Sequence, residues 1–224
     1  RAMNGVYVPF WTFDADTSSH YSGERGEYYY ETRTVQVRVN GKMETRQEQV
    51  RHTRWYSASG RVARDFDDVL IMASRSLPER LGDELTPWDM GALVPYNPEF
   101  LAGFQAEGYT VSLADGHDEA QERMSAVILQ DVRRDIGGDE QRVHSVDTDW
   151  SDETFKHILL PIWTAAYKYN GKSYRFLVNG QTGEVQGERP WSVWKIAFAV
   201  ILAAILVFGA IYLSDPEALN LPRP

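Results

Sequence analysis

The stretch "VPFWTF", residues 8–13, sets the expected fold because a near copy, "LPIWTA", occurs at residues 160–165. Both have the order apolar, Pro, apolar, Trp, Thr. Proline is tolerated at the first residue of a strand or on an edge strand, and a buried tryptophan needs a partner for its indole N–H. We therefore expect each stretch to begin a strand-rich segment, with Trp11 and Trp163 as core or recognition anchors.

Two β segments follow from these stretches. Residues 6–62 alternate apolar and polar side chains, with a hairpin turn at Asn40-Gly41, while residues 157–188 contain a second Asn-Gly turn at 170–171. A further turn is expected through Gly23 and Gly26. Trp55 and Tyr56 are additional core or recognition anchors. The two segments, around 6–62 and 157–188, resemble an internal β duplication.

Residues 65–137 differ from the β segments in composition and predict a helical insert between them. Their Asp, Pro and Gly positions favour short helical turns, and 117–136 predicts one long helix whose apolar stripe ends at Gly137-Gly138. Residues 137–153 form a polar stretch between the helical insert and the second β segment. The fold class expected is α+β, an antiparallel sheet built from N- and C-terminal strands with central helices.

Residues 196–213 carry no charge and no proline, and predict a transmembrane helix of ~27 Å. The flanking charges place the bulk of the protein in the cytoplasm and the tail on the other side of the membrane. The expected domains are 1–192, a transmembrane helix at 193–213 and an extracytoplasmic tail at 214–224. The membrane-interface residues are Trp191, Trp194, Lys195 and Tyr212.

Composition and motifs exclude several kinds of function. The net charge of −9 repels phosphate backbones, so no nucleic-acid partner is expected for this chain. Without cysteine there is no disulfide, thiol nucleophile or cysteine zinc site. "NGKS" at 170–173 lacks the earlier glycine of a phosphate-binding loop. "YSASG" at 56–60 is only superficially similar to a nucleophile elbow.

Metal binding is also not expected from spacing. No two histidines recur at the spacing of one helix face. Two acidic groups offer oxygen ligands for a hard cation, but helix caps and solvated loops explain them better; they are Asp65, Asp67 and Asp68, and Asp147, Asp149 and Asp152. We predict no catalytic, cofactor-binding or metal residue and no cofactor in this chain.

Three long phrases, at 5–26, 94–113 and 160–190, resemble a bacterial family of unassigned function. Its members have a zinc ribbon and a C-terminal membrane segment, and are labelled primosomal protein N′ (helicase)-like or TFIIB-type zinc-finger proteins. The resemblance implies zinc in a ribbon that precedes residue 1, and it implies that the membrane of the predicted span is the inner membrane of a bacterium. The ribbon is absent from this chain, and the helicase label has no supporting P-loop here.

The expected function is a scaffold or adaptor for protein partners, anchored in the bilayer by one C-terminal span. The alternative is a membrane-associated enzyme or small-ligand-binding domain with a cleft between the two β units. A flat exposed aromatic patch would favour the adaptor. A deep apolar pocket with convergent histidine or carboxylate groups would favour the alternative.

Overall fold

The computed structural model describes residues 3–39, 42–188, 198, 201–203 and 206–207. The chain divides into two units. One contains Ala2–Ala165 and Leu177–Gln186, and the other contains Arg1, Ala166–Phe176 and Gly187–Pro224. The candidate site lies wholly within the first of these.

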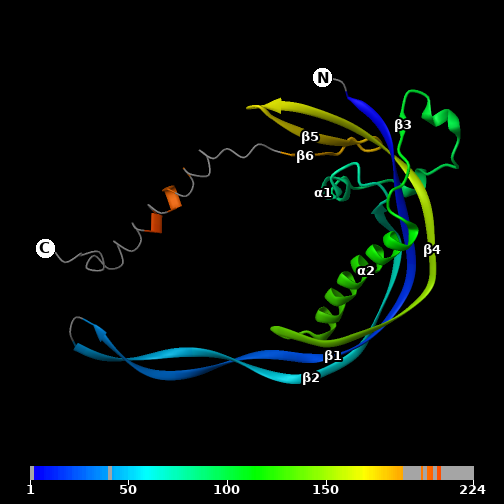
Figure 1. Ribbon diagram of the computed structural model, residues 1–224. Helices are drawn as coiled ribbons and strands as arrows, with labels where there is room; N and C mark the ends of the chain where they lie inside the picture. Colours follow the sequence, from blue (N-terminus) through cyan, green and yellow to red (C-terminus); the bar gives the residue numbers. More distant parts are fainter. Residues whose placement is uncertain (1–2, 40–41, 189–197, 199–200, 204–205, 208–224) are drawn as a thin grey trace. The chain divides into compact units, whose positions relative to one another are not determined.

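The sheet is dominated by three long strands. β1 (Asn4–Val39) and β2 (Lys42–Met72) form an antiparallel hairpin, and β4 (Glu140–Tyr169) pairs with the other side of β1 (Figure 1). β5 (Lys172–Asn179) and β6 (Val185–Gly187) complete the order β2-β1-β4-β5-β6. The two-residue β3 (Gln105–Ala106) pairs with β1 in parallel.

Helices are few in the described chain. α1 (Glu79–Asp83), η1 (Met90–Ala92) and η2 (Pro98–Leu101) are single turns, and α2 (Leu113–Ile136) is the long helix. Strands make up 57% and helices 22% of what the structure describes. The expected α+β class with a central helical insert is therefore wrong. β2 continues through 65–72, and the polar stretch 140–153 is strand, because both segments pair with β1.

Of the three turns predicted from the sequence, one is wrong, one is confirmed and one lies outside the described residues. β1 runs straight through Gly23 and Gly26, so the turn predicted there is wrong. At Asn170 and Gly171 both residues have positive φ, 49° and 76°, as the predicted Asn-Gly turn requires. Asn40 and Gly41 lie outside the described residues, although Val39 pairs with Lys42 on either side of them.

The register of β1 shifts against β2 between Phe13 and Ala15 and against β4 between Asp14 and Asp16, and such irregularities increase the local bend of a strand. Figure 1 shows that the long strands are bent. The neighbouring strands show irregularities nearby, since Asp68 and Asp152 have positive φ of 52° and 51°. Asp and Asn tolerate this left-handed conformation better than most residues. Asp68 and Asp152 therefore allow the strands to adopt the left-handed conformation at these irregularities.

The two Pro-Trp stretches lie side by side in antiparallel strands, with Val8 opposite Leu160. They do not begin their strands. The carbonyl of Pro9 accepts a hydrogen bond from Ala73 (2.9 Å), just past the end of β2, and that of Pro161 accepts one from Gly180 (2.8 Å), just past β5. Each proline thus sits where the outer neighbour ends, so its missing N–H removes no ladder bond.

Helix α2 begins four residues before the predicted start and ends at the predicted Ile136. Ser112 caps it, because its hydroxyl accepts from the Asp115 N–H (3.1 Å). Gly137, with φ of 66°, ends it. Buried residues recur every four positions and pack on the sheet; they are Gly116, Ala120, Met124, Ile128, Val132 and Ile136.

Side chains from both faces of the sheet are buried. Phe10 packs with Leu81 and Leu85, whereas the next residue, Trp11, packs with Ala120 and Met124 of α2. Successive residues of a strand point to opposite faces. The α1 segment and α2 therefore cover opposite faces of the sheet. The face that contains Trp11 also forms part of the candidate site.

The predicted membrane span is not supported. Within the described part of the chain, no helix is long and apolar enough to cross a bilayer. Helix is described only at 198, 201–203 and 206–207 of the predicted span, and a crossing needs one continuous helix of about 20 residues. This contradicts the transmembrane part of the fold, the inner-membrane location and the membrane-anchored function. The interface residues lie outside the described residues: Trp191, Trp194, Lys195 and Tyr212.

Candidate functional site

A cavity of about 570 Å³ opens to solvent between strands β1 and β4 and residues 92–107, which we call the cavity loop. The strands contribute Tyr7, His157 and Pro161 to its wall, and the loop contributes Leu93, Tyr96, Phe100 and Glu107. Small-molecule sites have volumes of roughly 300–1,000 Å³ and mainly apolar walls. This cavity has the size and character of such a site.

The cavity loop is fixed to the sheet near its end. Phe104 packs against Tyr7 and Trp163, with ring centroids 5.2 and 5.1 Å apart, and lies directly over Gly5. β3 then pairs with β1, and the Glu107 N–H donates to the Tyr7 carbonyl (3.0 Å). These contacts hold the end of the cavity loop against one end of β1, and the cavity lies beside them.

The outer part of the cavity loop exposes large apolar side chains. Val94 is 64% exposed, Tyr96 63% and Phe100 46%, and all three line the cavity. Single exposed apolar residues are ordinary, but a group beside a cavity marks a binding surface. An apolar ligand in the cavity would bury part of this surface.

Glu107 is the charged group of the cavity wall. Its Oε2 accepts hydrogen bonds from the hydroxyls of Ser74 (2.8 Å) and Ser76, which fix the carboxylate. It forms no ion pair with any described residue, and the lining residues include no lysine or arginine. Gln181 also lines the cavity and is held by the Asp89 backbone N–H, which donates to its Oε1 (3.0 Å).

His157 of β4 lines the cavity and is itself exposed. Its ring lies 4.5 Å from the Trp11 ring and 5.5 Å from the Tyr109 ring. Partial burial lowers the pKa of His157 below its ordinary value, because burial disfavours the charged imidazolium. The lowered pKa favours the neutral form of the imidazole.

The four predicted aromatic anchors lie in different places. Trp11 is buried, and its indole N–H donates to the Val111 carbonyl (3.0 Å). Trp163 is half-buried beside Phe104. Trp55 packs across Gly26 beneath the Arg142 guanidinium (3.8 Å), and Tyr56 is exposed. Only Trp11 and Trp163 contact residues of the cavity region, and neither lines the cavity itself.

Sequence reasoning missed Glu107, Tyr96 and Phe100, and treated His157 only as one of five unspaced histidines. The usable signal was the stretch 94–104, where exposed aromatic residues alternate with Pro, Asn and Gly. Such a segment cannot form a core strand or helix. The apolar side chains of Val94, Tyr96 and Phe100 therefore remain available to a partner.

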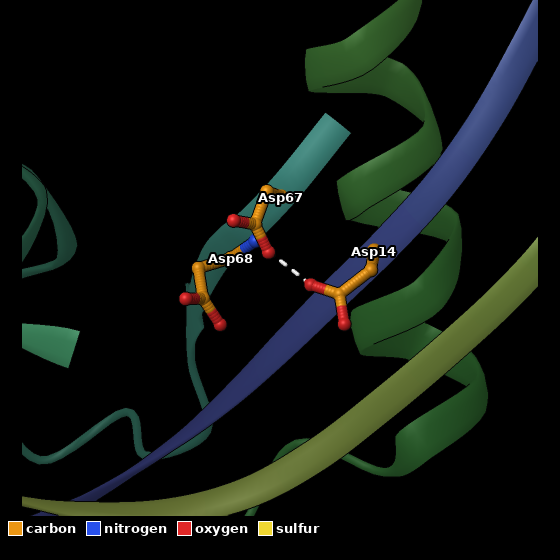
Figure 2. A group of neighbouring side chains, drawn as sticks. All are labelled: Asp14, Asp67 and Asp68. Atoms are coloured by element: carbon orange, nitrogen blue, oxygen red, sulfur yellow. Dashed lines mark hydrogen bonds between the residues drawn. The ribbon is translucent and has the colours of Figure 1, made fainter. Parts of the chain in front are cut away.

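Three aspartates meet where the register of β1 shifts against its neighbours. Figure 2 shows Asp14 of β1 facing Asp67 and Asp68 of β2, and carboxylate oxygens of the three lie within 4.8 Å of one another. The predicted group with Asp65 is thus rearranged, since Asp65 pairs opposite Asp16. The Lys156 ammonium lies 3.1 Å from Asp68 and 3.4 Å from Asp14. A cation from the chain itself therefore compensates the cluster.

Partial burial opposes ionisation of Asp14, but other interactions outweigh it. Hydrogen bonds from the Asp68 N–H (2.8 Å) and the Thr154 hydroxyl (2.7 Å), with the charge of Lys156, hold the pKa of Asp14 below its ordinary value. A depressed carboxyl pKa stabilises the fold above the unfolded-state pKa. That stability is lost as the pH falls through the folded-state pKa.

Lys156→Met is expected to lower the free energy of unfolding by about 0.5–1 kcal/mol at pH 7, since Lys156 is half-exposed and its ion pairs are screened. The loss should shrink toward zero as the pH falls below that of Asp14 ionisation. Denaturant unfolding between pH 2 and 7 measures it. Lys168→Met, an exposed lysine of the same strand, is the control and should change little. An equal loss at every pH would contradict the electrostatic account.

Comparison with known proteins finds a distant relative of this chain. The chain is 26% identical over 207 residues to "Uncharacterized protein YdjG" of Bacillus subtilis (strain 168), and the match covers 88% of this chain and 54% of that protein. The chain thus spans about half the length of that relative. The predicted zinc-ribbon resemblance, protein partners and upstream zinc are tested by none of the comparisons and stay predictions. No family model and no solved structure matches this chain.

Proposed function

We propose that the protein binds one small, mainly apolar molecule in the cavity between the cavity loop and strands β1 and β4. The observation that carries this proposal is the cavity of about 570 Å³ with half-exposed large apolar side chains at its rim. Burying these side chains against a ligand releases about 25 cal/mol per Å² of apolar surface. The fixed polar groups, Glu107 and Gln181, would orient the ligand.

Naphthylethanol is a suitable neutral probe because its fluorescence reports an apolar environment and its ring matches the aromatic wall. We expect saturable binding at one site. Tyr96→Ser should weaken binding severalfold by removing a ring from the rim. Tyr30→Ser is the matched control, because Tyr30 is 61% exposed against 63% for Tyr96 but belongs to the hairpin away from the cavity.

A second variant, Ala106→Phe, fills the cavity instead of widening it, since Ala106 lines the wall. It should also weaken naphthylethanol binding. Circular dichroism and denaturant unfolding of each variant check that the fold is kept. Binding that is non-saturable, or unchanged in both cavity variants, would contradict the proposed site.

A further inference from the structure

We infer that the ligand of this cavity carries a protonated amine, which the carboxylate of Glu107 binds while the apolar body lies among Tyr7, Tyr96 and Phe100. This inference rests on the proposed function and adds the chemical class of the ligand. It follows from the charges of the cavity wall, the way in which Glu107 is held, and the type of rings beside it.

Hydrogen bonds fix the position of the Glu107 carboxylate, but no ion pair with a described residue neutralises its charge. The two serine hydroxyls occupy Oε2, and Oε1 accepts none of the hydrogen bonds found among the described residues. Glu107 lines a mainly apolar cavity, and a carboxylate whose second oxygen accepts no such bond gains most from a charge-assisted hydrogen bond. A primary ammonium supplies both the donor and the opposite charge.

Other features of the chain favour a cation over an anion. The lining residues include no lysine or arginine, so the wall would leave a carboxylate or phosphate ligand unpaired. Tyr7, Tyr96 and Phe100 can present ring faces, which attract ammonium groups. The net charge of −9 also raises the local concentration of cationic ligands.

A matched pair of probes separates the charge from the ring. Naphthylethylamine and naphthylethanol differ only in the terminal group, and an alkyl amine, like lysine, is protonated at pH 7. Fluorescence titration of the full chain at low salt should show the amine binding about tenfold tighter or more. Glu107→Gln should reduce the preference to within about twofold, mainly by weakening the binding of the amine.

Three variants separate the charge of Glu107 from its hydrogen bonding and from the net charge of the chain. Glu107→Gln retains a carbonyl oxygen for the serine hydroxyls, and Glu107→Asp retains the charge and should keep more of the amine preference. Glu99→Gln removes the same charge from η2, outside the cavity lining, and should keep the full preference. A general effect of net charge would affect Glu99 and Glu107 variants alike.

Each outcome decides a separate point. Equal affinity of the normal protein for the amine and the alcohol would overturn the inference and leave the proposed function standing. A preference that survives in Glu107→Gln would overturn the role of Glu107. If neither probe binds saturably, both the inference and the proposed function fail.

Discussion

Replacing Trp11 with alanine is expected to lower the free energy of unfolding by about 3–5 kcal/mol, the usual cost of removing a buried tryptophan. Trp11 is 7% exposed and packs against Gly116, where a Cβ would lie only 2.9 Å from its ring. Its indole N–H is the partner of the Val111 carbonyl. The substitution therefore removes a contact between sheet and helix and leaves a buried carbonyl unpaired. Denaturant unfolding measures the loss.

Trp163→Ala is the matched control, because Trp163 has the same place in the second Pro-Trp stretch but is half-buried. It should cost about 1–2 kcal/mol, in proportion to the smaller apolar area buried. Trp11→Phe, which keeps most of the ring but removes the donor, should cost about 1–3 kcal/mol. Equal losses for the two alanine variants would contradict the unequal burial of the two tryptophans.

Ile128→Ala in helix α2 is expected to lower the free energy of unfolding by about 2–4 kcal/mol. Ile128 is 2% exposed and packs with Tyr21, Val132 and Ile136 between the helix and the sheet. Alanine keeps the helix propensity high, so the loss reports the cavity left in the core and not the helix itself. Chemical denaturation with far-UV circular dichroism provides the measurement.

The neighbouring Val127 gives the control for this prediction. Val127 and Ile128 are adjacent apolar residues of α2, but the structure buries Ile128 and leaves Val127 half-exposed. Val127→Ala should therefore change stability by less than about 1 kcal/mol. If both variants lost the same stability, the rotation of α2 on the sheet would differ from that described.

Local patterns predicted the elements that local interactions determine. The end of α2 followed from its glycines and last-turn arginines, and the Asn170-Gly171 turn from the conformational freedom of those residues. The start of α2 was placed late because Leu113 to Gly116 precede the clear apolar stripe. Ser112 and Asp115 were the missed capping signal.

Pairing between distant segments decided the rest. Gly23 and Gly26 read as turn residues, yet β1 continues because β2 and β4 pair on both sides, and Trp55 covers Gly26. The polar stretch 140–153 became a strand for the same reason, with Val143, Val146 and Trp150 packed toward α2. No local pattern specifies a partner more than 100 residues away.

The candidate site was equally hidden in the sequence. Tyr7, Glu107 and His157 belong to three segments that meet only because β1 pairs with both β3 and β4. Neither motif spacing nor composition brings these residue types together. The apolar span at 196–213 shows the opposite error, since hydropathy gave a strong local signal that the described helices do not support.

The most direct test of the proposed ligand site is hydrogen–deuterium exchange with and without saturating naphthylethanol. The account predicts slower exchange in the cavity loop, 92–107, and at 157–161 of β4, with no change in the hairpin at 29–39 and 42–52. Slower exchange confined to helix α2 or the hairpin, or no change in the cavity loop at saturation, would contradict it.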